Sequence, residues 1–165
     1  MKVLIVDDEA NLRRMLRALL EEEGYSVVEA SSAEKGLALL DEHRPETILL
    51  DVVLPGASGL ETLPSFQKQL PGAPVIMMSG EATLSDAARA TREGAFHFLE
   101  KPLTPEAVLV TLRAALEVSR ARDLSKALQE ELGPGALLVG TSRPMERVRE
   151  IIRKVAPTEA RVLIV

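Results

Sequence analysis

The chain has 165 residues, with 20 Lys and Arg against 25 Asp and Glu, a formal net charge of −5 and no cysteine. This length allows one domain of ordinary size plus a remainder, and an apolar fraction of 46% is sufficient for a core. The missing cysteine excludes disulfides, cysteine-ligated zinc and a thiol nucleophile. Because no apolar run reaches the roughly 18–20 residues that span a bilayer, and no basic stripe suits nucleic acid, we expect a cytoplasmic protein that binds neither membrane nor nucleic acid.

Short apolar runs alternate with amphipathic helical patterns over the first 104 residues. Five strands are predicted by the apolar runs at 2–6, 27–28, 47–50, 74–78 and 96–99. Helical patterns lie between them at 12–20, from a capping box at Ser31 and Glu34 to Pro45, at 60–70 and at 83–93. The stronger runs are apolar at every position, which is typical of parallel strands covered on both faces. The sequence therefore predicts an α/β, doubly wound, open parallel sheet.

An unusually long helical pattern follows. It begins at Pro105, which Thr104 can cap, and no helix breaker appears for about 28 residues, or roughly 42 Å. In its last part, leucines recur every four residues among charged side chains, at Leu124, Leu128 and Leu132. The pattern fits either a solvated linker helix or a short coiled coil, and the second alternative predicts a homodimer through this helix.

A second unit begins after residue 135. Its helical pattern carries one apolar face, formed by Met145, Val148, Ile151, Ile152 and Val155. An apolar run at 161–165 predicts a buried strand that stops in mid-pattern, which favours a piece of a longer protein. The expected organisation is a domain over 1–120, a linker helix over 121–135 and a fragment of a further domain over 136–165.

Polar side chains follow four of the predicted strands. Asp7 and Asp8 follow the first, Asp51 the third, Ser79 the fourth and Lys101 the fifth. With a flavodoxin-like strand order, 2-1-3-4-5, these groups meet beyond the carboxyl ends of the strands. At ~4 Å the aspartates would repel by roughly 1–4 kcal/mol per pair, so they need protons or a cation. Oxygen ligands alone select a hard divalent ion, naturally Mg²⁺.

The same residue types suit phosphoryl transfer. A carboxylate can accept a phosphoryl group as an acyl phosphate, and a metal ion neutralises the charge that develops. Lys101 supplies a cation for a phosphoryl oxygen, and Ser79 supplies a hydroxyl donor.

Four motifs of the chain resemble the receiver domain of two-component response regulators. They are VDDE at 6–9, LLDVVLPGASG at 49–59, MMSG at 77–80 and GAFHFLEKP at 94–102. The resemblance covers about residues 2–120. It implies a CheY-like fold, Mg²⁺ as cofactor and phosphorylation by a sensor histidine kinase.

Four residues take metal-binding and acceptor roles by this resemblance. Asp51 matches the phosphoryl acceptor, and Asp7 and Asp8 match the metal-binding acids. The family also ligates metal through a backbone carbonyl two residues after the acceptor, which is Val53 here.

Three further residues match the groups that respond to phosphorylation. Lys101 matches the lysine that contacts the phosphoryl group, and the Lys101–Pro102 bond is expected to be cis. Ser79 and Phe98 match the switch hydroxyl and the switch aromatic residue. The family commonly has tyrosine at the second position, so the ring of Phe98 lacks a hydroxyl that could bind a partner.

Three arginines, Arg13, Arg14 and Arg17, form a basic face on the first predicted helix. We interpret them as a solvated face. The alternative is a role in kinase docking, since this helix lies near the docking surface in receiver domains.

The C-terminal segment resembles a second family. Residues 139–165 are similar to the opening of the AAA+ ATPase domain in NtrC-type, sigma-54-dependent transcription activators. The Walker A motif is absent from the sequence, so we expect no ATP site and no enzyme activity beyond accepting and slowly losing a phosphoryl group. The resemblance implies that phosphorylation controls dimer packing and assembly of the protein's own AAA+ domain.

Two other classes of protein share parts of this pattern. A flavodoxin-like electron carrier needs a phosphate cradle after the first strand, where this chain has DDEAN, and aromatic residues beside the flavin, of which this chain has four in all. A phosphatase with an aspartyl nucleophile needs a second acid two residues after the nucleophile, where Val53 stands.

Overall fold

The computed structural model describes residues 1–80, 84–132 and 142–155. The chain divides into two compact units, residues 1–123 and 124–165. The first unit alternates strands and helices in the order β1 (Lys2–Val6), α1 (Ala10–Glu22), β2 (Ser26–Ala30), α2 (Ala33–His43), β3 (Thr47–Asp51), α3 (Gly59–Gln69), β4 (Val75–Ser79), α4 (Leu84–Arg92), β5 (His97–Glu100) and α5 (Pro105–Leu132).

The strands form one parallel sheet in the order β2-β1-β3-β4-β5. This is the predicted doubly wound, CheY-like fold. In the register of the central strands, Val6 lies opposite Leu50 and Asp51 lies opposite Met78. The carboxyl ends of β1, β3 and β4 therefore lie at one edge of the sheet, where the candidate site residues follow.

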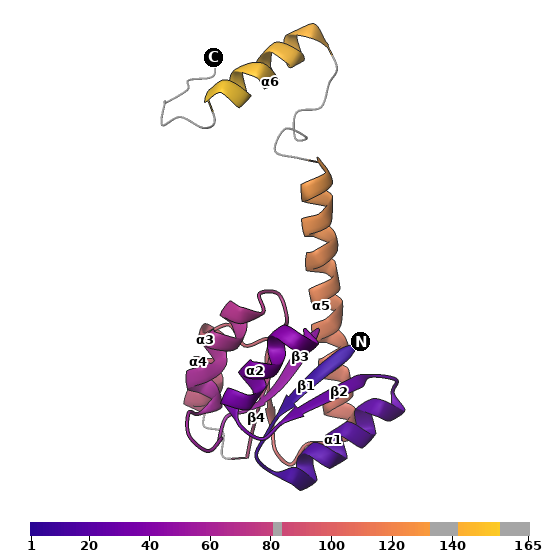
Figure 1. Cartoon of the computed structure of the whole chain (residues 1–165), viewed down its shortest axis with the longest axis vertical. Coiled ribbons are helices and arrows are strands. Elements are labelled where there is room, and N and C mark those ends of the chain that lie inside the picture. The colour runs from indigo at the N-terminus through magenta and orange to yellow at the C-terminus, as the bar shows by residue number, and fades with distance from the viewer. Residues whose placement is uncertain (81–83, 133–141, 156–165) are drawn as a thin grey trace. The chain divides into compact units, whose positions relative to one another are not determined.

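Each face of the sheet has its own apolar core. The face covered by α2, α3 and α4 buries Leu4, Val6, Ile48, Leu50, Leu63, Phe66 and Ala90. The opposite face, covered by α1 and α5, buries Val3, Ile5, Leu16, Leu20, Leu49, Ile76 and Leu112 (Figure 1). Successive residues of β1 and β3 alternate between these cores, which is why the runs are apolar throughout.

One predicted helix cap, at the start of α2, was wrong. There the predicted cap was Ser31, but Ser32 accepts the hydrogen bond from the Lys35 amide at 3.3 Å. Ser31 instead accepts from Lys35 Nζ at 3.0 Å. Ser32 has extended backbone dihedrals, so the cap is the second of two adjacent serines, which composition alone does not separate. The predicted cap at Thr104 is confirmed by its 3.3 Å bond from the Ala107 amide.

The long helix α5 has the 28 residues that the sequence predicts. Ser119 Oγ donates to the Gly72 carbonyl at 3.2 Å, which ties α5 to the loop before β4. In the last described turns, the side chains of Leu124 and Leu128 are 63% and 48% exposed. The linker helix over 121–135 stays a prediction. The helix α5 includes residues 121–132 of this range, and the remainder lies outside the described residues.

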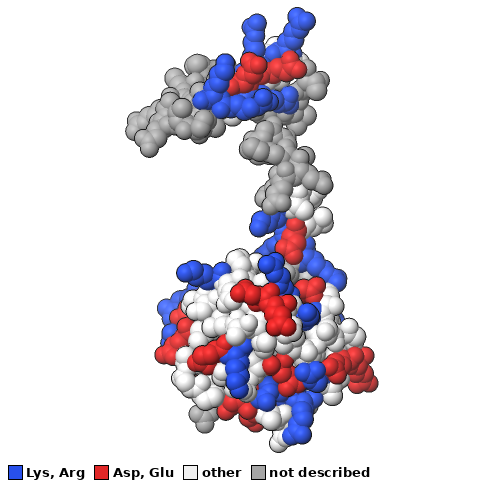
Figure 2. Space-filling model, viewed as in Figure 1, with Lys and Arg blue, Asp and Glu red and all other residues white. Residues whose placement is uncertain are grey.

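In the second unit the structure describes α6 (Arg143–Val155). The apolar residues Val148, Ile151 and Ile152 are exposed on it. The strand predicted at 161–165 lies outside the described residues. Within the described part of the chain, no helix has the length and apolar character to cross a membrane. Acidic and basic side chains are mixed over the visible face of the first unit (Figure 2).

Candidate functional site

Three carboxylates meet at the carboxyl edge of the sheet. Asp7 and Asp8 follow β1, and Asp51 ends the neighbouring strand β3. One oxygen from each carboxylate lies within 4.8 Å of the others, a spacing that could hold a metal ion. Asp7 and Asp51 are buried and Asp8 is exposed, so an ion here would keep contact with water. An oxygen-only donor set of this kind fits Mg²⁺, which retains several waters.

Lys101 completes the cluster from the end of β5. Its Nζ atom donates to Asp51 Oδ2 at 2.8 Å and to Asp7 Oδ2 at 2.9 Å, and reaches Glu9 Oε1 at 3.5 Å. The Lys101–Pro102 bond is cis, as expected. Burial disfavours the charged amine, but the hydrogen bonds that Lys101 donates to Asp51 and Asp7 outweigh this cost and raise the pKa of Lys101 above its usual range. The amine is therefore a permanent cation between two carboxylates.

Asp51 is buried, with only 3% of the residue exposed. Burial raises its pKa above the ordinary value, and the charge of Asp7 adds to the rise. Hydrogen bonds from Lys101 and from the Val53 amide, 3.3 Å from Asp51 Oδ1, act in the opposite direction. The ionised carboxylate is thus costly when unpaired, and a cation beside it relieves that cost.

Close packing at Gly59 fixes the backbone of Asp51. The Gly59 amide donates to the Val52 carbonyl at 2.9 Å, and Ser58 and Glu61 form a capping box at the start of α3. Gly59 ends the LLDVVLPGASG motif, but the pattern of the sequence did not predict its contact with β3. A glycine at the first position of a helix, directly after a serine cap, is a signal that could have identified a close backbone approach.

The predicted switch residues lie on the neighbouring strands. Ser79 ends β4 and is 1% exposed, one residue beyond Met78, the register partner of Asp51. Phe98 on β5 is half-buried and packs against the core that α2, α3 and α4 cover. The switching roles of Ser79 and Phe98 stay predictions, as does the metal-binding role of the Val53 carbonyl.

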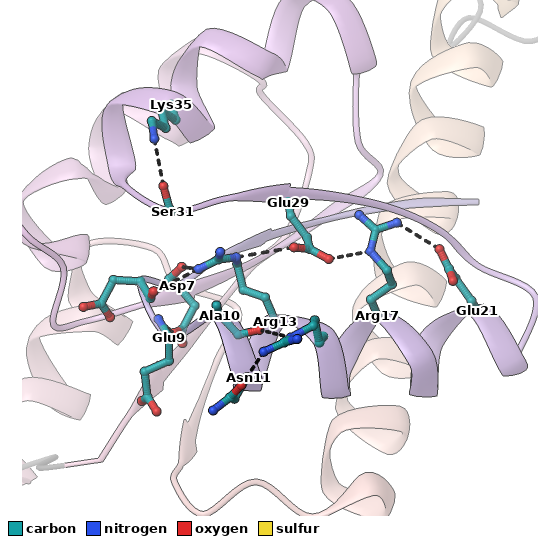
Figure 3. A network of polar contacts seen from close by, with 12 residues as sticks. Asp7, Glu9, Ala10, Asn11, Arg13, Arg17, Glu21, Glu29, Ser31 and Lys35 are labelled. Atoms are coloured by element: carbon teal, nitrogen blue, oxygen red, sulfur yellow. Dashed lines mark hydrogen bonds and ion pairs between the residues drawn. The ribbon is translucent and has the colours of Figure 1, made fainter.

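The interpretation of the basic face of α1 was wrong for Arg13. Its side chain is only 15% exposed, and Nη1 donates to the carbonyl oxygens of Asp7 and Asp8 (Figure 3). Arg17 pairs with Glu29 and Glu21. The helical spacing places these arginines on one face but does not show that one of them reaches back to the loop.

A parallel sheet in this order, with three acids and a lysine at its carboxyl edge, defines the CheY-like class of α/β domains. The sequence signature of the response regulator receiver domain matches residues 3–113. The chain therefore belongs to the receiver domain family of response regulators.

Two curated relatives are named as regulatory proteins. The nitrogen assimilation regulatory protein NtrX of Azorhizobium caulinodans is 36% identical over 165 residues, which is 99% of this chain and 36% of the relative. The C4-dicarboxylate transport transcriptional regulatory protein DctD of Pseudomonas aeruginosa is 35% identical over a match that covers 99% of this chain and 36% of the length of DctD. The chain thus spans about a third of the length of these relatives.

Solved structures agree with both the fold and the family. The crystal structure of NtrX from Brucella abortus is 35% identical, with a TM-score of 0.75 over 98% of this chain and 36% of that protein. A CheY-like receiver domain protein of Methanospirillum hungatei is 31% identical, with a TM-score of 0.71 over 73% of this chain and 97% of that one. The second match shows that the first unit resembles a complete receiver domain.

Proposed function

We propose that this chain is a phosphorylation-operated receiver that accepts a phosphoryl group on Asp51 from a sensor histidine kinase in a Mg²⁺-dependent reaction. The observation that carries the proposal is the meeting of three carboxylates within 4.8 Å, with Lys101 Nζ 2.8 Å from Asp51. Asp7, Asp8, Asp51 and the Val53 carbonyl would hold the ion. When bound, Mg²⁺ would offset negative charge on the cluster and on the incoming phosphoryl oxygens.

In the proposed transfer, a carboxylate oxygen of Asp51 forms a bond to phosphorus. The phosphorus–nitrogen bond to the kinase histidine breaks, and its electron pair stays on the imidazole, which takes up a proton. Lys101 hydrogen-bonds a phosphoryl oxygen, and the Ser79 hydroxyl donates to another. The product is an acyl phosphate that the chain itself hydrolyses slowly, without turnover of other phosphate esters.

In the proposed response, phosphorylation of Asp51 changes the conformation of the domain. Ser79 and Phe98 move toward the phosphorylated Asp51, which shifts the face formed by α4, β5 and α5 between two states. Since α5 continues directly into the linker region, the shift alters how two copies pack through Leu124 and Leu128. This packing controls assembly of the protein's own AAA+ domain and so sigma-54-dependent transcription. Similarity to NtrX and DctD over 99% of this chain, tail included, supports that context.

Labelling with acetyl phosphate and Mg²⁺ tests the acceptor. We expect wild-type protein to gain one phosphoryl group that is labile to hydroxylamine, as an acyl phosphate is, and to gain none in EDTA. Asp51→Asn should not be labelled, whereas Asp41→Asn, which removes an exposed acid on α2, should behave as wild type. Labelling of Asp51→Asn at the wild-type rate would refute the proposal.

A further inference from the structure

The guanidinium of Arg13 lies against the loop that carries two of the three acids. Its Nη1 atom donates to the Asp7 carbonyl oxygen at 2.7 Å and to the Asp8 carbonyl oxygen at 3.0 Å (Figure 3). The Arg13 side chain is 15% exposed, so these bonds are partly shielded from water. Hydrogen bonds from a charged donor are stronger than those between neutral groups, so the contact can hold the loop.

The Arg13 amide also holds this loop, since it donates to the Glu9 carbonyl oxygen at 3.1 Å. The loop is short. It comprises the three residues between Val6, which ends β1, and Ala10, which begins α1. Glu9, the cap residue of α1, makes no side-chain capping bond. The Glu9 amide donates to Asp7 Oδ1 at 2.8 Å, so the geometry of the loop also orients the Asp7 carboxylate. Fixing the two carbonyls therefore holds the backbone from which the Asp7 and Asp8 side chains project.

Arg13 is itself held from the edge strand β2. Its Nε atom lies 3.4 Å from Glu29 Oε2, and the other oxygen of Glu29 pairs with Arg17. Arg17 also pairs with Glu21 at 3.0 Å (Figure 3). The negative charges of Glu29 and Glu21 offset the positive charges of Arg13 and Arg17. The role of Arg13 toward the acids is therefore geometric more than electrostatic.

We propose that Arg13 is a positioning residue of the metal site: it anchors the Asp7–Asp8 loop by its carbonyls and so holds two metal-binding carboxylates toward Asp51. The inference rests on the proposed function, because it assigns Arg13 to the Mg²⁺ site proposed there. A purely electrostatic role of Arg13 predicts the opposite change in Mg²⁺ affinity when Arg13 is removed. A positive charge near the acids weakens cation binding, so its removal would tighten binding of Mg²⁺.

The first test needs no metal. Amide hydrogen exchange of Asp8 and Glu9 is followed by NMR in EDTA for wild type, Arg13→Ala and Arg14→Ala. Arg14 is a matched control, since it adjoins Arg13 on α1 and, among the described residues, its guanidinium bonds to Ala10 and Asn11 of the same helix. We expect about tenfold faster exchange of the loop amides in Arg13→Ala, with β1 and β3 unchanged. Wild-type exchange in Arg13→Ala would overturn the anchoring role.

The second test measures Mg²⁺ binding from chemical shifts of the loop amides. We expect the half-saturating Mg²⁺ concentration to rise by about 10–100-fold in Arg13→Ala and to stay near wild type in Arg14→Ala. Unchanged or tighter binding in Arg13→Ala would overturn the inference. If Arg13→Ala does not fold, Arg13→Lys is measured instead, and wild-type values for both readouts would then overturn it.

The measurements distinguish a failure of the proposed function from a failure of this inference. Wild-type protein that does not bind Mg²⁺ would refute the metal site and, with it, this role of Arg13. Wild-type protein that binds Mg²⁺, beside an Arg13→Ala variant of equal affinity, would refute the role of Arg13 alone.

Discussion

Gly59 lies so close to Asp51 that a Cβ atom added to the glycine would be 1.9 Å from the Asp51 carbonyl oxygen. The first residue of α3 thus packs directly on the end of β3. This contact sets the backbone from which the Asp51 carboxylate projects, and any side chain at position 59 must displace that backbone.

We therefore expect Gly59→Ala to lower the free energy of unfolding by about 1–3 kcal/mol, the usual cost of overpacking. It should also slow labelling by acetyl phosphate, because Asp51 moves relative to Lys101. Gly80→Ala is the control, since among the described residues an added Cβ there meets Lys101 side-chain atoms at 3.9 Å. Chemical denaturation gives the stability. Equal stabilities of Gly59→Ala and Gly80→Ala would contradict the packing argument.

The raised pKa of Asp51 predicts a pH-dependent gain in stability for Asp51→Asn in EDTA. Since burial raises the folded-state pKa above the unfolded value, Asp51 stabilises the fold below the unfolded pKa and loses that contribution as pH rises through the folded pKa. Asparagine does not titrate. The unfolding free energy of Asp51→Asn relative to wild type should therefore increase between about pH 4 and pH 7.

The exposed carboxylate of Asp41 provides the comparison for this measurement, because Asp41→Asn removes an acid without a burial cost. The stability difference from wild type should rise more with pH for Asp51→Asn than for Asp41→Asn. Equal pH dependence of the two variants would contradict the assigned direction of the Asp51 pKa.

Removal of Lys101 should make the fold depend on Mg²⁺. Lys101→Ala leaves the buried carboxylates of Asp7 and Asp51 without their shared cation, at a cost of about 3 kcal/mol in EDTA. Mg²⁺ at a hundredfold excess over its dissociation constant would return about 2.7 kcal/mol. We expect a larger Mg²⁺-induced rise in Tm for Lys101→Ala than for wild type or Lys68→Ala, whose lysine is exposed on α3. Equal rises in Tm would contradict the idea that Lys101 and Mg²⁺ compete for the carboxylates of Asp7 and Asp51.

Much of this fold follows from apolar patterning. The runs at 2–6, 47–50 and 74–78 predict the central strands because both faces of the sheet are covered, so every position is apolar. The meeting of Asp7, Asp8 and Asp51 also follows from topology, because the carboxyl ends of neighbouring parallel strands share one edge.

The contacts that the sequence did not predict depend on side-chain direction. The distinction between Ser31 and Ser32 as a cap depends on one backbone dihedral pair. The bonds of Arg13 to the loop require a guanidinium that turns back toward the N-terminus of its helix, and periodicity carries no such detail.

Two exposed leucines on α5 provide the test of the proposed homodimer. Leu124 and Leu128 are four residues apart, 63% and 48% exposed, and flanked by charged side chains, as in the seam of a short coiled coil. In sedimentation equilibrium we expect the wild-type chain to dimerise and the double variant Leu124→Glu with Leu128→Glu to be monomeric, because acidic side chains in a seam repel and lose apolar contact. Lys126→Glu adds the same side chain to the exposed turn between them and should leave the dimer intact. A monomeric wild type would refute the homodimer, and equal association of all variants would place the dimer contact elsewhere. Either result would assign these leucines to a solvated helix.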